Sequence, residues 1–287
     1  MFLKIMRETY EFRVVEDFAG RLFRDDEGKK LGSGIVRLVQ IASDDPRLPK
    51  IGDLQREIRR DCNRSFFHGW HIKRQYSKQE FDLAELFSLA INSTFEPAGE
   101  ECGTKYDEST ACPKCGAGAK QVAALFLDWK GIPKNKDISR TIAGEIVVSK
   151  RLVELFNQQR ITGAEFRPLR QNPSSSAESK DWFQLLVQSA KTDVVPPTRA
   201  GIDPFDDDPK GECRCTQGDL IGLNLLSEVS VKSTTRDDAD MVCTRQFIGT
   251  RRGLLRPARI ILISPKVWRL IESEKLKGYE VEVAHLV

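Results

Sequence analysis

Short strand-like patterns dominate the first quarter of the chain. Residues 10–17 (YEFRVVED), 34–41 (GIVRLVQI) and 67–76 (FHGWHIKRQY) each predict a strand, because they are rich in β-branched and aromatic residues. Residues 53–64 (DLQREIRRDCNR) have the charge density of an exposed helix. The mixture of the two patterns indicates an α/β or α+β fold.

A helix is predicted from about residue 78 to residue 92. Ser77-Lys78-Gln79-Glu80 has the Ser-x-x-Glu spacing of a capping box, in which Ser and Glu bond each other's backbone N–H. The apolar residues that follow recur at helical spacing; they are Phe81, Leu83, Ala84, Leu86, Phe87 and Ala90.

The chain contains an internal echo. Residues 146–166 (IVVSKRLVELFNQQRITGAEF) and 261–281 (ILISPKVWRLIESEKLKGYEV) align without a gap at an offset of 115 residues. Each copy is typical of a strand, a Ser N-cap, a helix, a Gly C-cap and a second strand, which is a βαβ module. We therefore expect mixed sheets with two βαβ-like modules in the C-terminal two thirds. The equivalent pairs include Ser149 with Ser264, Leu155 with Leu270, Ile161 with Leu276, Gly163 with Gly278, and Glu165 with Glu280.

The remaining patterns divide the chain into four segments. Residues 121–129 (QVAALFLDW) predict a strand, and 182–189 (WFQLLVQS) a short buried element between two loop-like stretches, 170–179 and 196–212. The predicted segments are an N-terminal α/β region (1–95), a Cys knuckle with the first βαβ module (96–170), a linker (171–212), and a second Cys region with the second βαβ module (213–287).

Composition narrows the class of protein. Lys and Arg number 45 against 42 Asp and Glu, a formal charge of +3, too small to indicate a nucleic-acid or membrane partner by field alone. No apolar run could span a membrane, and Lys4, Arg7 and Glu8 interrupt any signal-peptide core. Seven cysteines in a chain of this size fit reduced thiols or metal ligands better than a disulfide framework. We expect a soluble cytoplasmic protein without a membrane partner.

The strongest chemical motif is Cys112-Pro113-Lys114-Cys115-Gly116. In a zinc knuckle the backbone N–H groups of such a turn point at sulfur, and the glycine after the last Cys supplies a positive φ. Cys102-Gly103 repeats the end of a knuckle, but Gly99 stands where its partner Cys would be. The pattern predicts structural zinc at Cys102, Cys112 and Cys115; the alternative is an empty remnant of a metal-binding ancestor.

A closed tetrahedral site needs a fourth ligand, and the sequence does not choose it. Candidates are Cys213, Cys215, Cys243, Cys62, His68 and His71.

A basic stretch, residues 249–259 (GTRRGLLRPAR), carries Arg251, Arg252, Arg256 and Arg259. These arginines are a candidate contact patch for phosphate or nucleic acid. The simpler interpretation is a basic loop entering the second module, paired with acidic residues such as 206–208 or 237–238. Nucleophile elbows, phosphate loops and metalloprotease motifs are absent from the sequence, so no catalytic residues are predicted and we do not expect an enzyme.

The knuckle, residues 223–228 (LNLLSE), 249–257 (GTRRGLLRP) and the closing ILISPKVWRLIESEKLKGYEVE together resemble the double-CXXCG motif family over about residues 65–287. Members of that family are immunity proteins of bacterial polymorphic-toxin and contact-dependent killing systems. The resemblance implies a non-catalytic protein that binds a cognate toxin and blocks it. A zinc-ribbon protein that binds nucleic acid or regulates expression is the alternative, and a thiolate enzyme is the third hypothesis.

Overall fold

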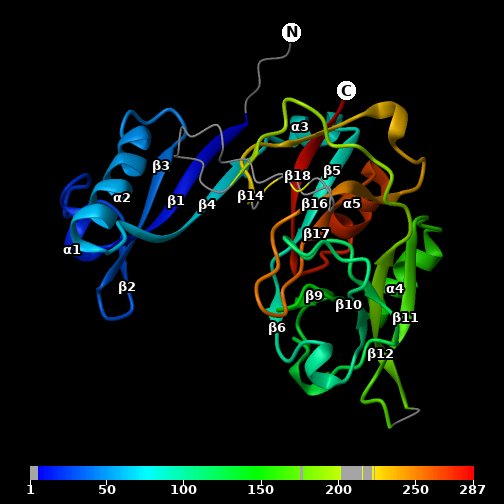
Figure 1. The fold of residues 1–287 in the computed structure, drawn as a ribbon. Coiled ribbons are helices and arrows are strands. Elements are labelled where there is room, and N and C mark those ends of the chain that lie inside the picture. The colour runs from blue at the N-terminus through cyan, green and yellow to red at the C-terminus, as the bar shows by residue number, and fades with distance from the viewer. Residues whose placement is uncertain (1–5, 175–176, 202–214, 216–221, 223) are drawn as a thin grey trace. The chain divides into compact units, whose positions relative to one another are not determined.

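The computed structural model describes residues 6–174, 177–201, 215, 222 and 224–287. It has an α+β fold with mixed sheets, one of the two classes that the sequence predicted (Figure 1). Described residues up to Leu83 form one compact unit, and those from Ala84 onward form the second. The boundary predicted at residue 95 therefore falls inside the second unit.

The first unit is an antiparallel sheet with helices on one face. Its strand order is β2-β3-β1-β4. Ile51 and Ile58 from the longest helix pack with Phe12 from the central strand, and all three are almost fully buried. The elements are β1 (Arg7–Val15), α1 (Glu16–Ala19), β2 (Lys29–Leu31), β3 (Val36–Ala42), α2 (Leu48–Cys62), β4 (Phe67–Gln75) and α3 (Lys78–Leu83). The three strands and the helix predicted here are confirmed, and α2 begins before the predicted start at residue 53.

The helix predicted over 78–92 is wrong beyond Leu83. Its capping box forms: the Ser77 N–H donates to Glu80 Oε2 at 2.7 Å, and the Glu80 N–H donates to Ser77 Oγ at 3.2 Å. After one short helix, however, residues 86–91 form strand β5 (Leu86–Ile91), the central strand of a five-stranded sheet in the second unit. A run of apolar residues satisfies a buried strand as well as a helix, and pairing on both edges decides for the strand.

The second unit contains two five-stranded sheets, with orders β11-β12-β10-β9-β6 and β15-β18-β5-β17-β16. The first sheet consists of β6 (Thr94–Phe95), β9 (Ile138–Thr141), β10 (Ile146–Ser149), β11 (Ala164–Arg170) and β12 (Glu178–Val187). The second consists of β5, β15 (Val229–Val231), β16 (Met241–Ile248), β17 (Ala258–Ile263) and β18 (Tyr279–Leu286). Smaller elements are β7 (Tyr106–Asp107), β8 (Lys120–Gln121), β13 (Ala200–Gly201), β14 (Asn224–Leu225), and the 3-10 helices Glu100–Cys102, Trp129–Gly131 and Ser233–Thr235.

Two local predictions meet different outcomes. The buried element at 182–189 is largely β12. The strand predicted over 121–129 does not form: only Gln121, in β8, is in a strand. Leu125 and Leu127 are nevertheless buried, in a cluster with Val147 and Leu169. Phe126 forms only an isolated parallel bridge with Arg170, so burial and this single bridge account for the strand-like pattern there.

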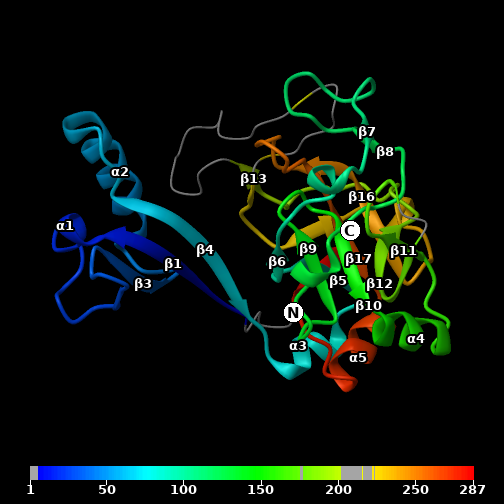
Figure 2. The same ribbon diagram turned by 90° about the horizontal axis from the view of Figure 1, so that it is seen from below.

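Both βαβ modules form, and each belongs to a different sheet. In the first, α4 (Lys150–Gln158) connects β10 to β11; in the second, α5 (Pro265–Ser273) connects β17 to β18. The two strands of each module are parallel and enclose one antiparallel strand, β12 in the first and β5 in the second. The two helices lie beside each other at the same end of the unit (Figure 2).

The predicted serine caps are confirmed, whereas the predicted glycine C-caps are wrong. Ser149 accepts a hydrogen bond from the Leu152 N–H, as the N-cap of α4; Ser264 does the same for α5. The left-handed residues that end the helices are Arg160 (φ 49°) and Lys275 (φ 52°), which are again 115 residues apart. The two glycines lie three residues further along the chain, where they serve a different purpose.

Gly163 in the first module lies against β16, the strand that precedes the second module. It has φ +86°, and a Cβ at this position would overlap the carbonyl oxygen of Met241. The preceding residue, Thr162, donates its N–H to Asp240 Oδ2 at 3.0 Å. Asp240 also accepts the hydroxyl of Ser264 at 2.9 Å, so one carboxylate holds its own module's helix cap and the other module's loop.

The reciprocal contact is made by the second module on the first. Gly278 has φ +109°, and a Cβ here would overlap the carbonyl oxygen of Ile138. Lys277 donates its N–H to Asp137 Oδ2 at 3.0 Å, and Asp137 accepts the Ser149 hydroxyl at 3.2 Å. The internal echo therefore corresponds to a pseudo-symmetric interlock, in which the loop after each module's helix packs against the strand that precedes the other module.

Acid is expected to weaken this interlock through Asp240. Burial raises its pKa, but hydrogen bonds from the Thr162 N–H, the Ser264 hydroxyl and Lys266 outweigh that effect and leave the pKa below its ordinary value of 3.8. A carboxyl whose folded pKa is lowered stabilises the fold above the unfolded pKa, and the stabilisation is lost as pH falls through the folded pKa.

Asp240→Asn should therefore be less stable than the wild type at pH 7 by about 1 to 3 kcal/mol, since it replaces an acceptor with an amide beside a backbone N–H. The difference should shrink as pH falls below about 4. Urea unfolding of both proteins between pH 2.5 and 7 measures it. A difference that is constant over this range would contradict the assignment.

Candidate metal centre

The turn at residues 112–116 has the geometry of a knuckle. The N–H groups of Lys114 and Cys115 bond the sulfur of Cys112, and the N–H of Ala117 bonds the sulfur of Cys115. Gly116 has φ +78° and donates its N–H to the Cys112 carbonyl at 2.8 Å. The predicted N–H to sulfur bonds and the predicted left-handed glycine are both present. Both thiols are buried.

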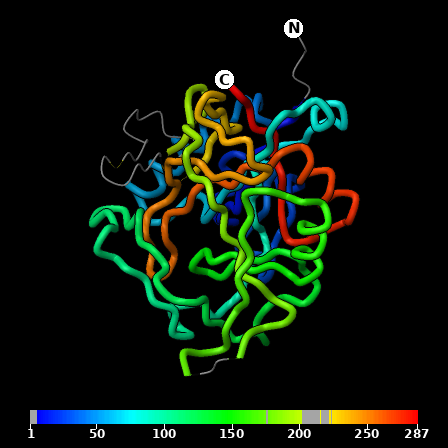
Figure 3. The backbone as a smooth tube through the Cα atoms, turned by 90° about the vertical axis from the view of Figure 1, so that its right-hand side faces the viewer, coloured from blue at the N-terminus to red at the C-terminus, as the bar shows by residue number. Residues whose placement is uncertain are grey.

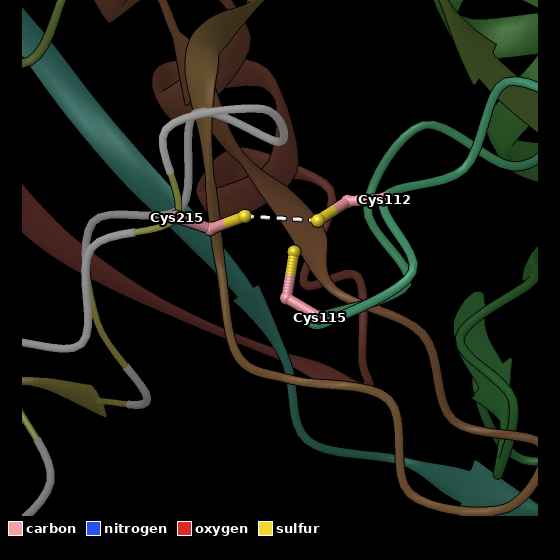
Figure 4. A group of neighbouring side chains, drawn as sticks. All are labelled: Cys112, Cys115 and Cys215. Atoms are coloured by element: carbon pink, nitrogen blue, oxygen red, sulfur yellow. Dashed lines mark hydrogen bonds between the residues drawn. The ribbon is translucent and has the colours of Figure 1, made fainter.

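A third thiol, from a segment a hundred residues away, completes the cluster. The sulfur atoms of Cys112, Cys115 and Cys215 all lie within 4.8 Å of one another (Figure 4). The Cys112 and Cys215 sulfurs are 2.9 Å apart, too far for a disulfide bond, and all three thiols are free. Zinc–sulfur bonds of about 2.3 Å would hold three thiolates in a group of this size. The arrangement can bind a metal ion.

The pKa values of the thiols favour binding of a cation. The Cys215 thiol, followed by the N–H groups of Cys115 and Lys114, lowers the pKa of Cys112 to about 7. Burial, reinforced by the neighbouring sulfurs, raises the pKa of Cys115 to about 12. Deprotonation of one thiol is therefore possible near neutral pH, and the negative charge of that thiolate opposes deprotonation of a second thiol. A bound cation removes this conflict, because its charge stabilises every thiolate that ligates it.

The loop between β16 and β17 supports the knuckle from the second module, and it lies beside the knuckle segment in Figure 3. Arg251 donates its backbone N–H to the Cys115 carbonyl at 2.8 Å. Its side chain lies over Gly116, where a Cβ would come within 2.8 Å of it, and its guanidinium bonds Glu108 at 2.7 Å. Phe247 of β16 packs against the thiol cluster.

Arg256 of the same loop is almost entirely enclosed, with 10% of its side chain exposed. It forms ion pairs with Glu100 at 3.0 Å and Glu108 at 2.8 Å, and its guanidinium lies 3.9 Å from the ring centre of Tyr106. Arg259 bonds the Thr244 carbonyl and lies over the Phe247 ring.

The predicted basic patch is therefore mostly engaged inside the protein. Of its four arginines, Arg251, Arg256 and Arg259 have partners within the chain, while Arg251 and Arg252 are both exposed. The partners of the ion pairs are Glu100 and Glu108, which precede the knuckle, not the aspartates at 237–238 that the sequence suggested. The other suggested partners, 206–208, lie outside the described residues.

Cys102 does not belong to the thiol cluster. Gly103 has φ +102° as in a knuckle ending, but the Cys102 sulfur accepts the Asp128 N–H instead, and burial raises its pKa. Gly99 is required by packing: a Cβ there would come within 2.6 Å of Leu125 and 2.7 Å of Glu145. A cysteine at this position would require these neighbouring side chains to shift.

The other residues proposed as the fourth ligand lie either outside the thiol cluster or outside the described residues. Cys243 is buried in β16, where burial raises its pKa to about 12. Cys62, His68 and His71 belong to the first unit. Cys213 lies outside the described residues. The sequence therefore identified two members of the cluster and, among its alternatives, the third; spacing could not single out Cys215, because a three-dimensional contact joins it to the knuckle.

No carboxylate or imidazole belongs to the thiol cluster among the residues that the structure describes. Within the same residues, no helix combines the length and apolar character needed to cross a membrane. Neither the known family models nor the curated proteins provide a match to this chain.

Proposed function

We propose that Cys112, Cys115 and Cys215 hold a structural zinc ion. The observation that carries this proposal is the convergence of three thiols, two of them on a turn whose N–H groups bond sulfur. All-sulfur donor sets of this kind suit zinc in structural sites, which are closed and four-coordinate. Cys213, two residues before Cys215, stays a candidate for the fourth ligand.

Such a zinc ion would fasten two segments together: the knuckle, which precedes the first module, and the segment that carries Cys215, between the two modules. The hairpin of β16 and β17 contacts the same knuckle through Arg251 and Phe247. The metal would replace apolar packing at a place where polar loops meet. With Cys213 or another residue as the fourth ligand, its role would be architectural, because a site filled by four protein ligands keeps no open position for a substrate.

On this scaffold we infer a non-catalytic binding protein of the immunity type, which neutralises a cognate bacterial toxin by direct contact in the cytoplasm. Support comes from the motifs that resemble the double-CXXCG family and from the structural character of the thiol cluster. Charged loops such as residues 232–240 would provide charge complementarity to the toxin and would speed association with it.

Co-expression tests this function. The toxin encoded beside this protein should stop growth when expressed alone, and the present chain should restore growth and co-purify with the toxin. A matched control is Cys62→Ser, which alters an exposed thiol outside the cluster and should protect fully. If the toxin neither binds the chain nor is inhibited by it, the proposal fails.

Nucleic-acid binding, the alternative function, is tested in the same preparation. A protein that contacts several phosphates loses affinity steeply with salt. Since three of the four arginines have internal partners, we expect no binding of single- or double-stranded DNA or RNA at 50 mM salt in a fluorescence anisotropy titration. Tight, salt-steep binding that Arg252→Glu abolishes would favour the alternative.

A further inference from the structure

The sheet of the first unit has one covered face and one open face. Tyr10, Phe12 and Val14 of β1 point into the core beneath the helices. Glu11 and Arg13 alternate with them and therefore belong to the opposite face. Strand register places Gln40 and His71 on either side of Glu11 on this face. It also places Leu38 beside Arg13, and Lys29 beside Leu38.

A hollow of about 280 Å³ lies on this open face, lined by Glu11, Arg13, Gly69, Trp70 and His71. It coincides with an irregularity in the pairing of β1 with β4: the register shifts between Phe12 and Val14, so that β4 bulges opposite Arg13. At Gly69 a Cβ would meet nothing within 4 Å. The missing side chain of Gly69 therefore leaves open space at the bulge. Bulges recur in proteins where a strand must redirect side chains toward a site.

The charges around the hollow are unbalanced. Its one carboxylate, Glu11, is already bonded to Lys73 at 2.6 Å and to Gln40 at 2.7 Å, and these bonds lower its pKa. Arg13 is exposed and makes no hydrogen bond or ion pair in the described part of the chain. His71 next to it is also exposed. An unoccupied guanidinium at the rim of a hollow is a ready partner for a carboxylate.

We propose that this hollow receives an acidic side chain, aspartate or glutamate, from a protein partner that docks on the open face of the sheet. Arg13 bonds the carboxylate, the bulge at Gly69 makes room for its methylene groups, and Lys29 and Lys73 attract the surrounding acidic surface. The partner is the toxin of the proposed function; the chemistry of the hollow itself depends only on the residues that line it.

A peptide titration tests the hollow independently of any toxin. The full-length ¹⁵N-labelled chain is titrated with acetylated, amidated hexaglutamate at low salt, and hexaglutamine serves as the uncharged control. Amide shifts should concentrate at residues 11–13 and 69–71 with hexaglutamate and be absent with hexaglutamine. Shifts spread over other basic surfaces, or none at these residues, would overturn the proposal.

Three variants sharpen the test. Arg13→Glu should weaken peptide binding roughly tenfold, the effect of losing one charge-assisted contact. Gly69→Val should weaken it similarly, because it fills the hollow without a clash. Lys50→Glu on α2 makes the same charge change at an exposed position on the helical side, and binding should be unchanged. Equal losses with Arg13→Glu and Lys50→Glu would show non-specific attraction and overturn the proposal.

The toxin assay then separates the two hypotheses. Arg13→Glu should bind the toxin more weakly while remaining folded, as its amide spectrum shows. If Arg13→Glu binds and neutralises the toxin as well as the wild type does, the docking inference fails and the proposed function stands. If wild-type protein does not bind the toxin at all, the proposed function fails, and the peptide titration still decides the chemistry of the hollow.

Discussion

Cys115→Ser is expected to abolish zinc binding, from about one zinc ion per chain in the wild type to none. Cys115 supplies one of three clustered thiols and is buried, so its loss leaves too few ligands for a closed site. Because zinc binds the folded chain, its loss should lower the stability by about 4 kcal/mol when free zinc exceeds its dissociation constant a thousandfold. Zinc content of protein purified without added metal, with chemical unfolding of both proteins, measures the two effects.

Two matched variants identify which thiols hold the metal. Cys215→Ser should lose zinc like Cys115→Ser, although it lies a hundred residues away. Cys102→Ser should retain about one zinc ion, because the Cys102 sulfur bonds the Asp128 N–H outside the cluster. Titration of the wild type with a mercurial should release the zinc together with the folded signal. A folded wild type without zinc, whose three thiols all react freely, would contradict the site.

Gly278→Ala is expected to cost about 4 kcal/mol or more, among the largest effects of a single substitution. The alanine Cβ would overlap the Ile138 carbonyl, and φ +109° is unfavourable for any residue with a Cβ. The backbones of the two modules would have to separate, which would also break the bond from Lys277 to Asp137. Thermal and urea unfolding measure the loss.

The control for Gly278→Ala is Gly144→Ala. Gly144 has a similar φ of +100°, but a Cβ there would meet nothing within 4 Å, so only the backbone preference is lost, about 1 kcal/mol. Gly163→Ala should resemble Gly278→Ala, because Gly163 makes the reciprocal contact with Met241. Similar small losses for all three variants would show that the modules do not interlock through these glycines.

Local sequence signals located several parts of the fold well. Ser149 and Ser264 cap their helices because a serine side chain can satisfy an N-terminal N–H without help from distant residues. Gly116 adopts a positive φ in the knuckle for an equally local reason, since the turn between two nearby cysteines requires it. The sequence alone could therefore predict these elements.

Other features depended on distant partners. Residues 86–91 form a strand because β17 and β18 pair with both of its edges, and no local signal separates a buried strand from a buried helix. Gly163 and Gly278 resemble C-caps in sequence, but the close approach of a carbonyl from the other module determines their role. A local pattern does not reveal which backbone will pass within contact distance.

By itself, the sequence determined a mixed α and β fold, the two related βαβ modules and the knuckle, because these rest on periodicity, on capping chemistry and on the short spacing of Cys112 and Cys115. Only the tertiary structure decided that the modules occupy separate sheets, that they interlock through Asp137 and Asp240, and that Cys215 joins the knuckle. Such contacts depend on the path of the whole chain: residues far apart in sequence meet only when strands pair and cores pack, and neither composition nor spacing records where that happens.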